Sequence, residues 1–317
     1  MNRREMLFGT AAVVCGGQAA ISRAAADPEG EAVGANGAGA GAGAGKAAGG
    51  QSADGQSAAA RHLAALEKRE GGRLGVAALD TATGHRLQHR SDERFGMCSV
   101  FKFLAAGAIL KRVDQGTEHL DRRVAYTESD LLEYAPVAKE HVKEGAMLLG
   151  NLCAAAVQWS DNTAANLMLK VLGGPATVTA FIRATGDQVT RLDNIEPALN
   201  VVRPGEVHDT TTAASMVGLL NSVVLGNVLS NSSRTFLQGW MLDAKVGEHR
   251  LPAGVPSGWR VAHKTGTWDD QTNDVAIIWP PTRSPIIVAA LYSRNGTRKE
   301  QRENVLREVG RIVTAAF

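Results

Sequence analysis

The stretch "GMCSVFKFLAAGAIL", residues 96–110, marks a change of pattern in this chain. Before it, "RLGVAALD" (73–80) and "HRLQHR" (85–90) have the composition of strands and predict a hairpin across "TATG". From Ser99 onward, apolar residues recur at the spacing of one helix face. The stretch therefore separates a strand-forming region from a helical region.

Helical patterns dominate the middle of the chain, and strand patterns return near its end. We expect helices at residues 58–69, 147–158, 162–172, 175–185, 211–224, 232–243 and 299–316. We expect strands at residues 259–266, 273–280 and 285–293. This order predicts an α+β protein, in which an antiparallel sheet with flanking helices is built from both ends and an all-helical part is inserted between them. A cleft between the two parts is the natural ligand site.

The first 26 residues have the pattern of an export signal. Paired arginines at positions 3 and 4 precede an apolar run over 6–21, and three alanines at 24–26 offer a cleavage site. The pair resembles a twin-arginine signal, so we expect an exported protein, periplasmic or secreted. The apolar run is short and contains glycine, so we do not expect a stable membrane span.

Residues 27–57 predict a flexible linker, because glycine, alanine and small polar residues dominate and little apolar surface is available for burial. Residues 58–317 then form the domain that carries the chemistry, with a sheet-containing part at about 58–95 and 244–317 and a helical part at about 96–243. The full chain has a formal net charge of +2. Such a small excess of positive charge does not indicate a nucleic-acid partner.

Ser99 and Lys102 are the first candidates for chemistry. At a spacing of three residues in a helix, their side chains lie on the same face. A partly desolvated lysine can lose its charge and accept the proton of a serine hydroxyl. The alternative is that Ser99 caps the helix while Lys102 lies on the surface, since serine is a preferred capping residue.

Two further segments are ambiguous when each is taken alone. Ser160-Asp161-Asn162 places a hydroxyl, a carboxylate and an amide before an apolar helix, where serine or aspartate is also an ordinary cap. "HKTGT" places Lys264, Thr265, Gly266 and Thr267 on an expected strand. A glycine there permits close approach of a ligand to the backbone, whereas the simpler alternative is an exposed lysine.

The three segments together, in the order S-x-x-K, S-D-N and K-T-G, resemble the penicillin-recognising serine enzymes. A fourth, "RLDNIEPALN" (191–200), resembles the omega loop of the class A β-lactamases, with Glu196 and Asn200 at the deacylating positions. The resemblance covers residues 60–315. It implies a β-lactamase/transpeptidase-like fold and hydrolysis of the β-lactam ring of penicillin- or cephalosporin-type antibiotics, giving antibiotic resistance.

The resemblance also implies roles for the catalytic residues. Ser99 would attack the lactam carbonyl, and either Lys102 or Glu196 acting through a water would accept its proton. The backbone N–H groups of Ser99 and Thr267 would form the oxyanion hole. Ser160 would pass a proton to the lactam nitrogen. Glu196 and a water positioned with Asn200 would then hydrolyse the acyl-enzyme.

Substrate-binding residues follow in the same way. Lys264, with Thr265 and Gly266 beside it, would hold the electrostatics around Ser160 and the substrate carboxylate. Many class A enzymes place an arginine on the following strand, where this chain has Asn273. A subgroup supplies the arginine upstream, so we expect Arg250 to pair with the substrate carboxylate; the alternative is a surface arginine.

On the cleft walls, the resemblance implies that Asn162 binds the acylamide side chain of the substrate and that Tyr134 flanks the mouth of the cleft. It implies no cofactor and no metal, and the histidines show no zinc-binding spacing. The expected partner is a small β-lactam, and we expect a monomer.

The sequence departs from the family at two places. Many members join the ends of the omega loop with an arginine–aspartate pair, but Asn194 here faces Asp209, so only a hydrogen bond is available. Cys98 and Cys153 match cysteines that form bridges in relatives, but the partner positions are occupied by Trp268 and Ala106. We expect both thiols to be free and buried.

Three rival hypotheses remain: a cell-wall peptidase acting on D-Ala-D-Ala, a sensor that is acylated once and stays modified, and a secreted structural domain. The peptidase should lack the segment around Glu196. Glu196 and Asn200 argue against the sensor as well, and four motifs in order make coincidence remote.

Overall fold

The computed structural model describes residues 53–203 and 205–317. The export signal and nearly all of the linker expected from the sequence lie outside these residues. The helices are α1 (Ala53–Glu70), α2 (Phe101–Asp114), α3 (Ala138–His141), α4 (Leu149–Gln158), α5 (Asn162–Leu172), α6 (Pro175–Ala184), α7 (Ala213–Leu219), α8 (Asn231–Leu242) and α9 (Lys299–Ala316). Strands β1 (Arg73–Asp80), β2 (Arg86–His89), β7 (Arg260–Trp268), β8 (Gln271–Trp279) and β9 (Ile286–Ser293) build the main sheet.

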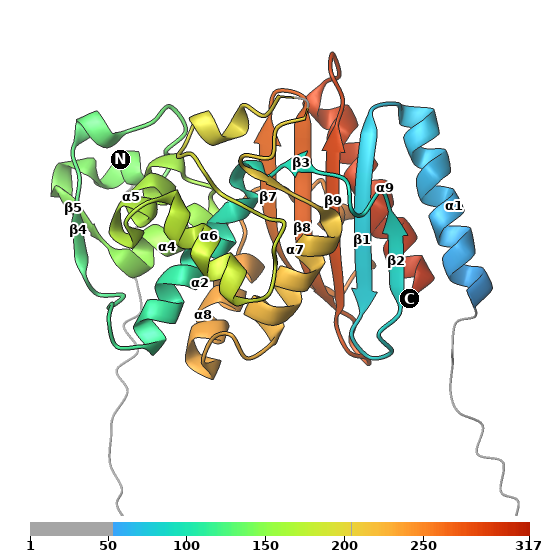
Figure 1. Cartoon of the computed structure of the whole chain (residues 1–317), viewed down its shortest axis with the longest axis horizontal. Helices are drawn as coiled ribbons and strands as arrows, with labels where there is room; N and C mark the ends of the chain where they lie inside the picture. Colours follow the sequence, from blue (N-terminus) through green and yellow to red (C-terminus); the bar gives the residue numbers. More distant parts are fainter. Residues whose placement is uncertain (1–52, 204) are drawn as a thin grey trace, which may run out of the picture. The chain divides into compact units, whose positions relative to one another are not determined.

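The main sheet draws its strands from both ends of the described chain. The strand order is β2-β1-β9-β8-β7, and every neighbouring pair is antiparallel. Strand β7 therefore lies at one edge, beside the helical region (Figure 1). Strands β8 and β9 are buried over almost their whole length. The sequence of β9 and the second half of β8 are apolar and rich in β-branched residues, whereas the first half of β8 is polar. The expected α+β class with an antiparallel sheet is confirmed.

Helices cover both faces of this sheet (Figure 1). On one face, α1 and α9 pack against the strands around a core that includes Leu63, Val76, Ile278 and Val309. On the other face, α2 and the helices around it form a second core that reaches Val275. The site described below lies on this second side, where helices meet the edge strand β7.

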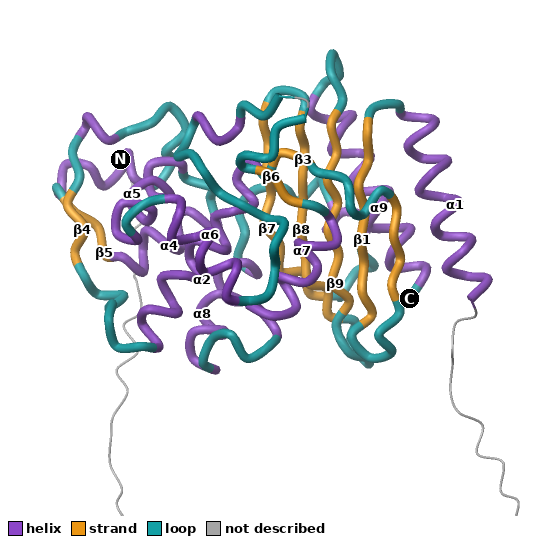
Figure 2. The backbone as a smooth tube through the Cα atoms, viewed as in Figure 1, coloured by secondary structure: helices purple, strands orange, loops and turns teal. Residues whose placement is uncertain are grey.

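Helix α2 is the centre of the helical part (Figure 2). Residues Phe101–Leu110 are all buried, so the helix has no solvent-facing side over these positions. It contacts α4, α5, α6 and α8. A helix that is apolar all round belongs in the interior of a protein. Lys102 is carried into that interior by the same helix, which makes its environment unusual for a lysine.

Several elements differ from the sequence expectations. Helix α1 begins at Ala53 rather than at residue 58, so it includes the last residues of the expected linker. Two small ribbons were missed, β3 (Phe95–Gly96) with β6 (Thr210–Thr211) and β4 (Arg123–Ala125) with β5 (Ala146–Leu148). These strands have two or three residues each, which is too short for a periodic signal, and distant segments pair them. The helix expected over 211–224 is divided into α7 and a π-helical segment, Leu220–Leu225.

Candidate active site

Ser99 lies in a short 3-10 turn, Cys98–Val100, which leads directly into α2. Cys98 has a φ of 47°, a left-handed conformation that is uncommon outside glycine. The N-cap residue of α2 is Val100, which directly precedes Phe101 and makes no side-chain capping hydrogen bond. The Ser99 hydroxyl instead donates to Glu196 Oε1 at 3.1 Å. The alternative in which Ser99 is a helix cap is therefore wrong.

Lys102 follows one turn later and is fully buried. Its ammonium donates to the Ser160 carbonyl at 2.8 Å and to Asn162 Oδ1 at 2.5 Å, and it forms an ion pair with Glu196 Oε1 at 3.0 Å. Burial lowers the pKa of Lys102, while the neighbouring Glu196 carboxylate acts in the opposite direction. The surface-lysine alternative is excluded.

Asp161 is the cap of α5, because its Oδ1 accepts from Ala164 N at 2.8 Å. Its other oxygen accepts from the backbone of Val137 and Ala138, both at 2.9 Å. The capping role expected for this segment thus belongs to Asp161, which leaves the hydroxyl of Ser160 available. Ser160 has a φ of 60°, and this left-handed conformation turns the chain just before the helix begins.

Lys264 approaches Ser160 from strand β7. Its ammonium donates to Ser160 Oγ at 2.9 Å and to the Thr265 carbonyl at 2.8 Å. The side chain is 1% exposed, so the alternative of an exposed strand lysine is wrong. Burial, reinforced by the positive charges of Lys102 and Arg250, holds the pKa of Lys264 well below its usual range. A hydroxyl with this lysine as its donor keeps its own proton free for another acceptor.

Two asparagines hold Glu196 in place, one through its carboxylate and one through its backbone. Asn200 donates from Nδ2 to Glu196 Oε2 at 2.7 Å, and its own Oδ1 is buried without a hydrogen-bond partner in the described part of the chain. Asn166 on α5 holds the backbone of Glu196, accepting from its N–H and donating to its carbonyl, both at 2.9 Å. The sequence analysis missed Asn166. Its position one turn after Asn162 on the same helix face is the signal that could have found it.

The two ends of this loop are joined through Asp209. Asn194 Nδ2 donates to Asp209 Oδ2 at 2.7 Å, so the expected hydrogen bond in place of an ion pair is confirmed. Asp209 Oδ1 also accepts from the backbone N–H groups of Asp193 and Asn194, at 2.7 and 3.0 Å. One carboxylate therefore receives three donors and holds the start of the loop to its end.

Arg250 is buried against strand β7, at Gly266 and Thr267. Its guanidinium donates to the carbonyls of Gly266 and Asn273 at 3.0 and 2.8 Å and pairs with Glu303 at 3.2 Å. Nη2 donates to Thr267 Oγ1 at 2.6 Å. The surface-arginine alternative is wrong, because the residue is 2% exposed. Its donors are occupied by the protein, and the Thr267 hydroxyl is the side-chain contact that Arg250 makes on β7.

The remaining candidate residues border the same region. Tyr134 is half exposed and donates from its hydroxyl to the Trp159 carbonyl at 3.2 Å. Asn162 is joined to it through the backbone, donating to the Tyr134 carbonyl at 3.0 Å. Gly266 lies against the segment before Ser99, since an added Cβ would come within 2.8 Å of the Met97 carbonyl oxygen. A side chain at this position would force β7 away from that segment.

Cys98 and Cys153 are free and fully buried, as expected. The Cys98 thiol lies 3.5 Å from Gln271 Oε1, as a weak hydrogen-bond donor.

Among residues 53–203 and 205–317, no group of three or more His, Cys, Asp or Glu side chains could hold a metal ion. Over the same residues no single helix is long and apolar enough to cross a membrane, although α5 and α6, bent by 74°, pass that test of length and composition as a pair.

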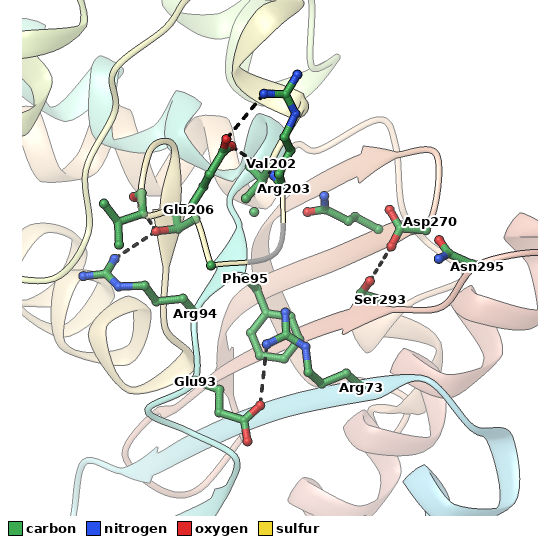
Figure 3. Close-up of a pocket in the computed structure, with 15 residues that line it drawn as sticks. Arg73, Glu93, Arg94, Phe95, Val202, Arg203, Glu206, Asp270, Ser293 and Asn295 are labelled. Carbon is green, nitrogen blue, oxygen red and sulfur yellow. Dashed lines mark hydrogen bonds and ion pairs between the residues drawn. The ribbon is translucent and has the colours of Figure 1, made fainter.

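A hollow of about 670 Å³ lies to one side of these residues, against β3 and residues 202, 203 and 205–207 (Figure 3). On its wall, Arg73 pairs with Glu93 at 3.6 Å and lies 4.1 Å from the centre of the Phe95 ring. Ser99, Lys102 and Lys264 do not line it. The hollow is therefore separate from the cluster that surrounds Ser99.

The arrangement around Ser99 is that of an enzyme that uses a serine for acyl transfer, because a hydroxyl, a carboxylate and two buried ammonium groups converge beside a strand edge. A model of the β-lactamase enzyme family matches residues 58–317. The chain belongs to this family and, within it, to class A.

Named relatives agree with this assignment. β-Lactamase L2 of Stenotrophomonas maltophilia is 46% identical over 256 residues, which cover 80% of this chain and 84% of the relative. β-Lactamase CTX-M-8 of Citrobacter amalonaticus is 44% identical over 256 residues, covering 80% and 88%. Among solved structures, an ancestral class A β-lactamase is 53% identical with a TM-score of 0.80, covering 82% of this chain and 100% of that chain.

Proposed function

We propose that this protein hydrolyses the β-lactam ring of penicillin- and cephalosporin-type antibiotics through an acyl-enzyme on Ser99, and so gives antibiotic resistance. The observation that carries the proposal is the position of Glu196. Its Oε1 lies 3.1 Å from the Ser99 hydroxyl and 3.0 Å from the Lys102 ammonium. A carboxylate held against the nucleophile can serve both formation and hydrolysis of an acyl-enzyme.

In acylation, Ser99 attacks the lactam carbonyl and its proton passes to Glu196, which already accepts its hydrogen bond. Lys102 is the alternative acceptor. Its ammonium bonds the Ser160 carbonyl and Asn162 Oδ1 and pairs with Glu196, and the Glu196 carboxylate opposes the lowering of its pKa by burial. The backbone N–H groups of Ser99 and Thr267 stabilise the oxyanion. Removing one such donor typically raises the barrier by about 3 kcal/mol.

Opening of the ring requires a proton on the lactam nitrogen. Ser160 is suited to relay it, because Lys264 donates to its oxygen and leaves its hydrogen free. The proton that Glu196 took from Ser99 then returns to Ser160 by way of Lys102, which contacts both Glu196 and the Ser160 carbonyl, and Glu196 is left ionised for deacylation. The substrate carboxylate then lies near the ammonium of Lys264 and the hydroxyl of Thr267, with Arg250 behind. Thr265 and Gly266 form the strand beside the substrate, Asn162 binds its acylamide group, and Tyr134 borders the cleft.

Deacylation needs a water activated by Glu196. The unpartnered, buried Oδ1 of Asn200 lies on the side chain that also holds Glu196, so it can accept a hydrogen bond from such a water. A sensor or a cell-wall peptidase needs no carboxylate in this position. The geometry therefore favours turnover over permanent acylation.

The test is steady-state hydrolysis of a chromogenic cephalosporin by the purified protein. We expect sustained turnover by the native chain and none by Ser99→Ala. Glu196→Ala should accumulate a covalent adduct that mass spectrometry detects on Ser99. A single round of acylation without turnover in the native chain would support the sensor instead, and release of D-alanine from a D-Ala-D-Ala peptide would support the peptidase.

We also propose that the protein is exported and that it is a monomer. The signal at residues 1–26 would deliver the enzyme to the compartment in which β-lactams act. We expect a monomer, which light scattering coupled to size-exclusion chromatography would check.

A further inference from the structure

Two side chains of β8 face the segment that precedes the nucleophile. Gln271 and Asn273 are two residues apart on the strand and therefore point to the same side of the sheet. Asn273 Nδ2 donates to the Gly96 carbonyl at 2.9 Å and to the Met97 carbonyl at 3.3 Å. Gln271 Oε1 lies 3.5 Å from the thiol of Cys98. Strand β8 thus contacts each of the three residues before Ser99.

The orientation of the Asn273 amide is set by its neighbours. Two carbonyl oxygens on one side require an N–H donor there, so Nδ2 must face them. Oδ1 is then buried and has no hydrogen-bond partner among the described residues. An unpaired buried oxygen is a cost to folding. Any stabilising effect of the Asn273 amide on the segment before Ser99 therefore comes from the two hydrogen bonds that its nitrogen makes.

These bonds act on a strained part of the backbone. Cys98 adopts a left-handed conformation with a φ of 47°, which persists only when its surroundings hold it in place. Asn273 fixes the two carbonyls before it, and Met97 N donates to the Asp209 carbonyl at 2.9 Å. The position of the Ser99 N–H follows from this conformation, because Ser99 is the next residue.

The backbone of Asn273 is joined to the other side of the cleft. Asn273 pairs with Gly266 in the register of β7 and β8, and Gly266 directly precedes Thr267. Arg250 Nη1 donates to the carbonyls of both Gly266 and Asn273, at 3.0 and 2.8 Å. The N–H of Thr267 and the side chain of Asn273 therefore belong to one rigid unit.

We propose that Asn273 is a positioning residue that sets the separation between the two oxyanion-hole donors, the N–H groups of Ser99 and Thr267. Its backbone is fixed to the strand that carries Thr267, and its side chain is fixed to the segment that carries Ser99. The proposal rests on the proposed function, because it takes the roles of Ser99 and Thr267 as given. Asn273 itself touches no reacting atom.

The test uses Asn273→Ser and Asn273→Ala in the full chain, with Ile278→Ala as a matched control. Ile278 is buried on the same strand but packs in the core on the opposite face of the sheet, so its loss weakens the fold without touching the segment before Ser99. We expect kcat/KM for a chromogenic cephalosporin to fall by about tenfold to a hundredfold in Asn273→Ala, since small displacements of catalytic groups have effects of this size. Ile278→Ala should keep its kcat/KM at a temperature where it is folded.

A spectroscopic measurement separates positioning from stability. In the Glu196→Ala background, which accumulates the acyl-enzyme, infrared difference spectra report the ester carbonyl stretch. Weaker oxyanion-hole hydrogen bonds should move this band to higher frequency in Asn273→Ala, and part of the way in Asn273→Ser, whose hydroxyl retains one donor. An unmoved band together with an unchanged kcat/KM would overturn the proposal. Absence of any acyl-enzyme in Glu196→Ala alone would instead count against the proposed function.

Discussion

At the scale of single residues, the site is governed by buried charges that compensate one another. Glu196 Oε1 receives both the Ser99 hydroxyl and the Lys102 ammonium, while Lys264 faces Ser160 a short distance away. Both lysines are buried, and burial lowers the pKa of each. Proton transfers in this cluster therefore need little reorganisation of solvent, which is the condition under which fixed charges are most effective.

This arrangement predicts the pH dependence of acylation in Glu196→Gln. Glu196 raises the pKa of Lys102, so its replacement by an amide should lower that pKa further. Acylation should slow by about a hundredfold, as expected for loss of a general base. The remaining acylation would use neutral Lys102 as the base, and Lys102 should stay neutral to more acidic pH in this variant than it does beside Glu196.

Stopped-flow acylation measured across the pH range would check this prediction. Residual acylation in Glu196→Gln that is already lost at alkaline pH would contradict it, because Lys102 would then keep the pKa of an ordinary lysine. Acylation at the native rate in this variant would show that Lys102, and not Glu196, is the first proton acceptor.

At the scale of elements, the omega loop that begins at residue 191 is closed through Asp209, whose carboxylate receives three donors from the start of the loop. Asn194 meets Asp209 by a hydrogen bond rather than an ion pair, and Asn166 on α5 holds the backbone of Glu196. Glu196, the proposed deacylating carboxylate, is thus positioned by a loop and by the helix against which the loop lies.

Replacement of Asn194 should weaken this closure. In Asn194→Ala we expect the free energy of unfolding to fall by about 1 kcal/mol, the value of a typical hydrogen bond. We also expect the substitution to reduce the rate of deacylation more than the rate of acylation. Asn194→Arg should keep both the free energy of unfolding and the deacylation rate of the native protein, because an arginine can pair with Asp209.

Arg203→Ala is the matched control in the same loop, since its side chain is 79% exposed and its pair with Glu206 spans 3.7 Å. Urea unfolding and single-turnover kinetics would measure the two effects. Equal losses of acylation and deacylation in Asn194→Ala would contradict a specific role of the closure.

The sequence patterns predicted these elements to different extents. Long apolar runs such as those of α2, β8 and β9 carry a strong periodic signal, and the ordered motifs located Ser99, Ser160, Glu196 and Lys264 together. The ribbons β3–β6 and β4–β5 could not be predicted, because pairing between distant residues forms them. The contacts of Asn166 and Asn273 with backbone groups were equally hidden, since an asparagine in sequence does not reveal which carbonyl it will meet.

At the scale of the whole described chain, the site is supported from behind the sheet. Helix α9 carries Glu303, which pairs with Arg250, and Arg250 in turn donates to the Thr267 hydroxyl on β7. Helix α9 is therefore connected through two side chains to the strand that carries the proposed substrate-binding residues. Such a path joins segments that are far apart in the sequence.

Glu303→Ala should leave the buried guanidinium of Arg250 without its carboxylate. We expect a loss of about 3 kcal/mol in stability, the cost of breaking a buried pair, and a several-fold rise in KM for penicillins, because the Thr267 hydroxyl loses its fixed donor. Glu300→Ala on the exposed side of the same helix is the control. Thermal unfolding and initial-rate kinetics would check both, and a KM unchanged in a folded Glu303→Ala protein would rule out the path.

The free thiol beside the nucleophile has a consequence for inhibitor design. Cys98 is the neighbour of Ser99, yet it is fully buried, and burial raises the pKa of its thiol above the ordinary value. Alkylating warheads react with exposed thiolates, and this sulfur offers neither exposure nor charge. A covalent inhibitor of the proposed site would therefore target Ser99. A cysteine-directed electrophile would react with Cys98 only after local unfolding had exposed the thiol.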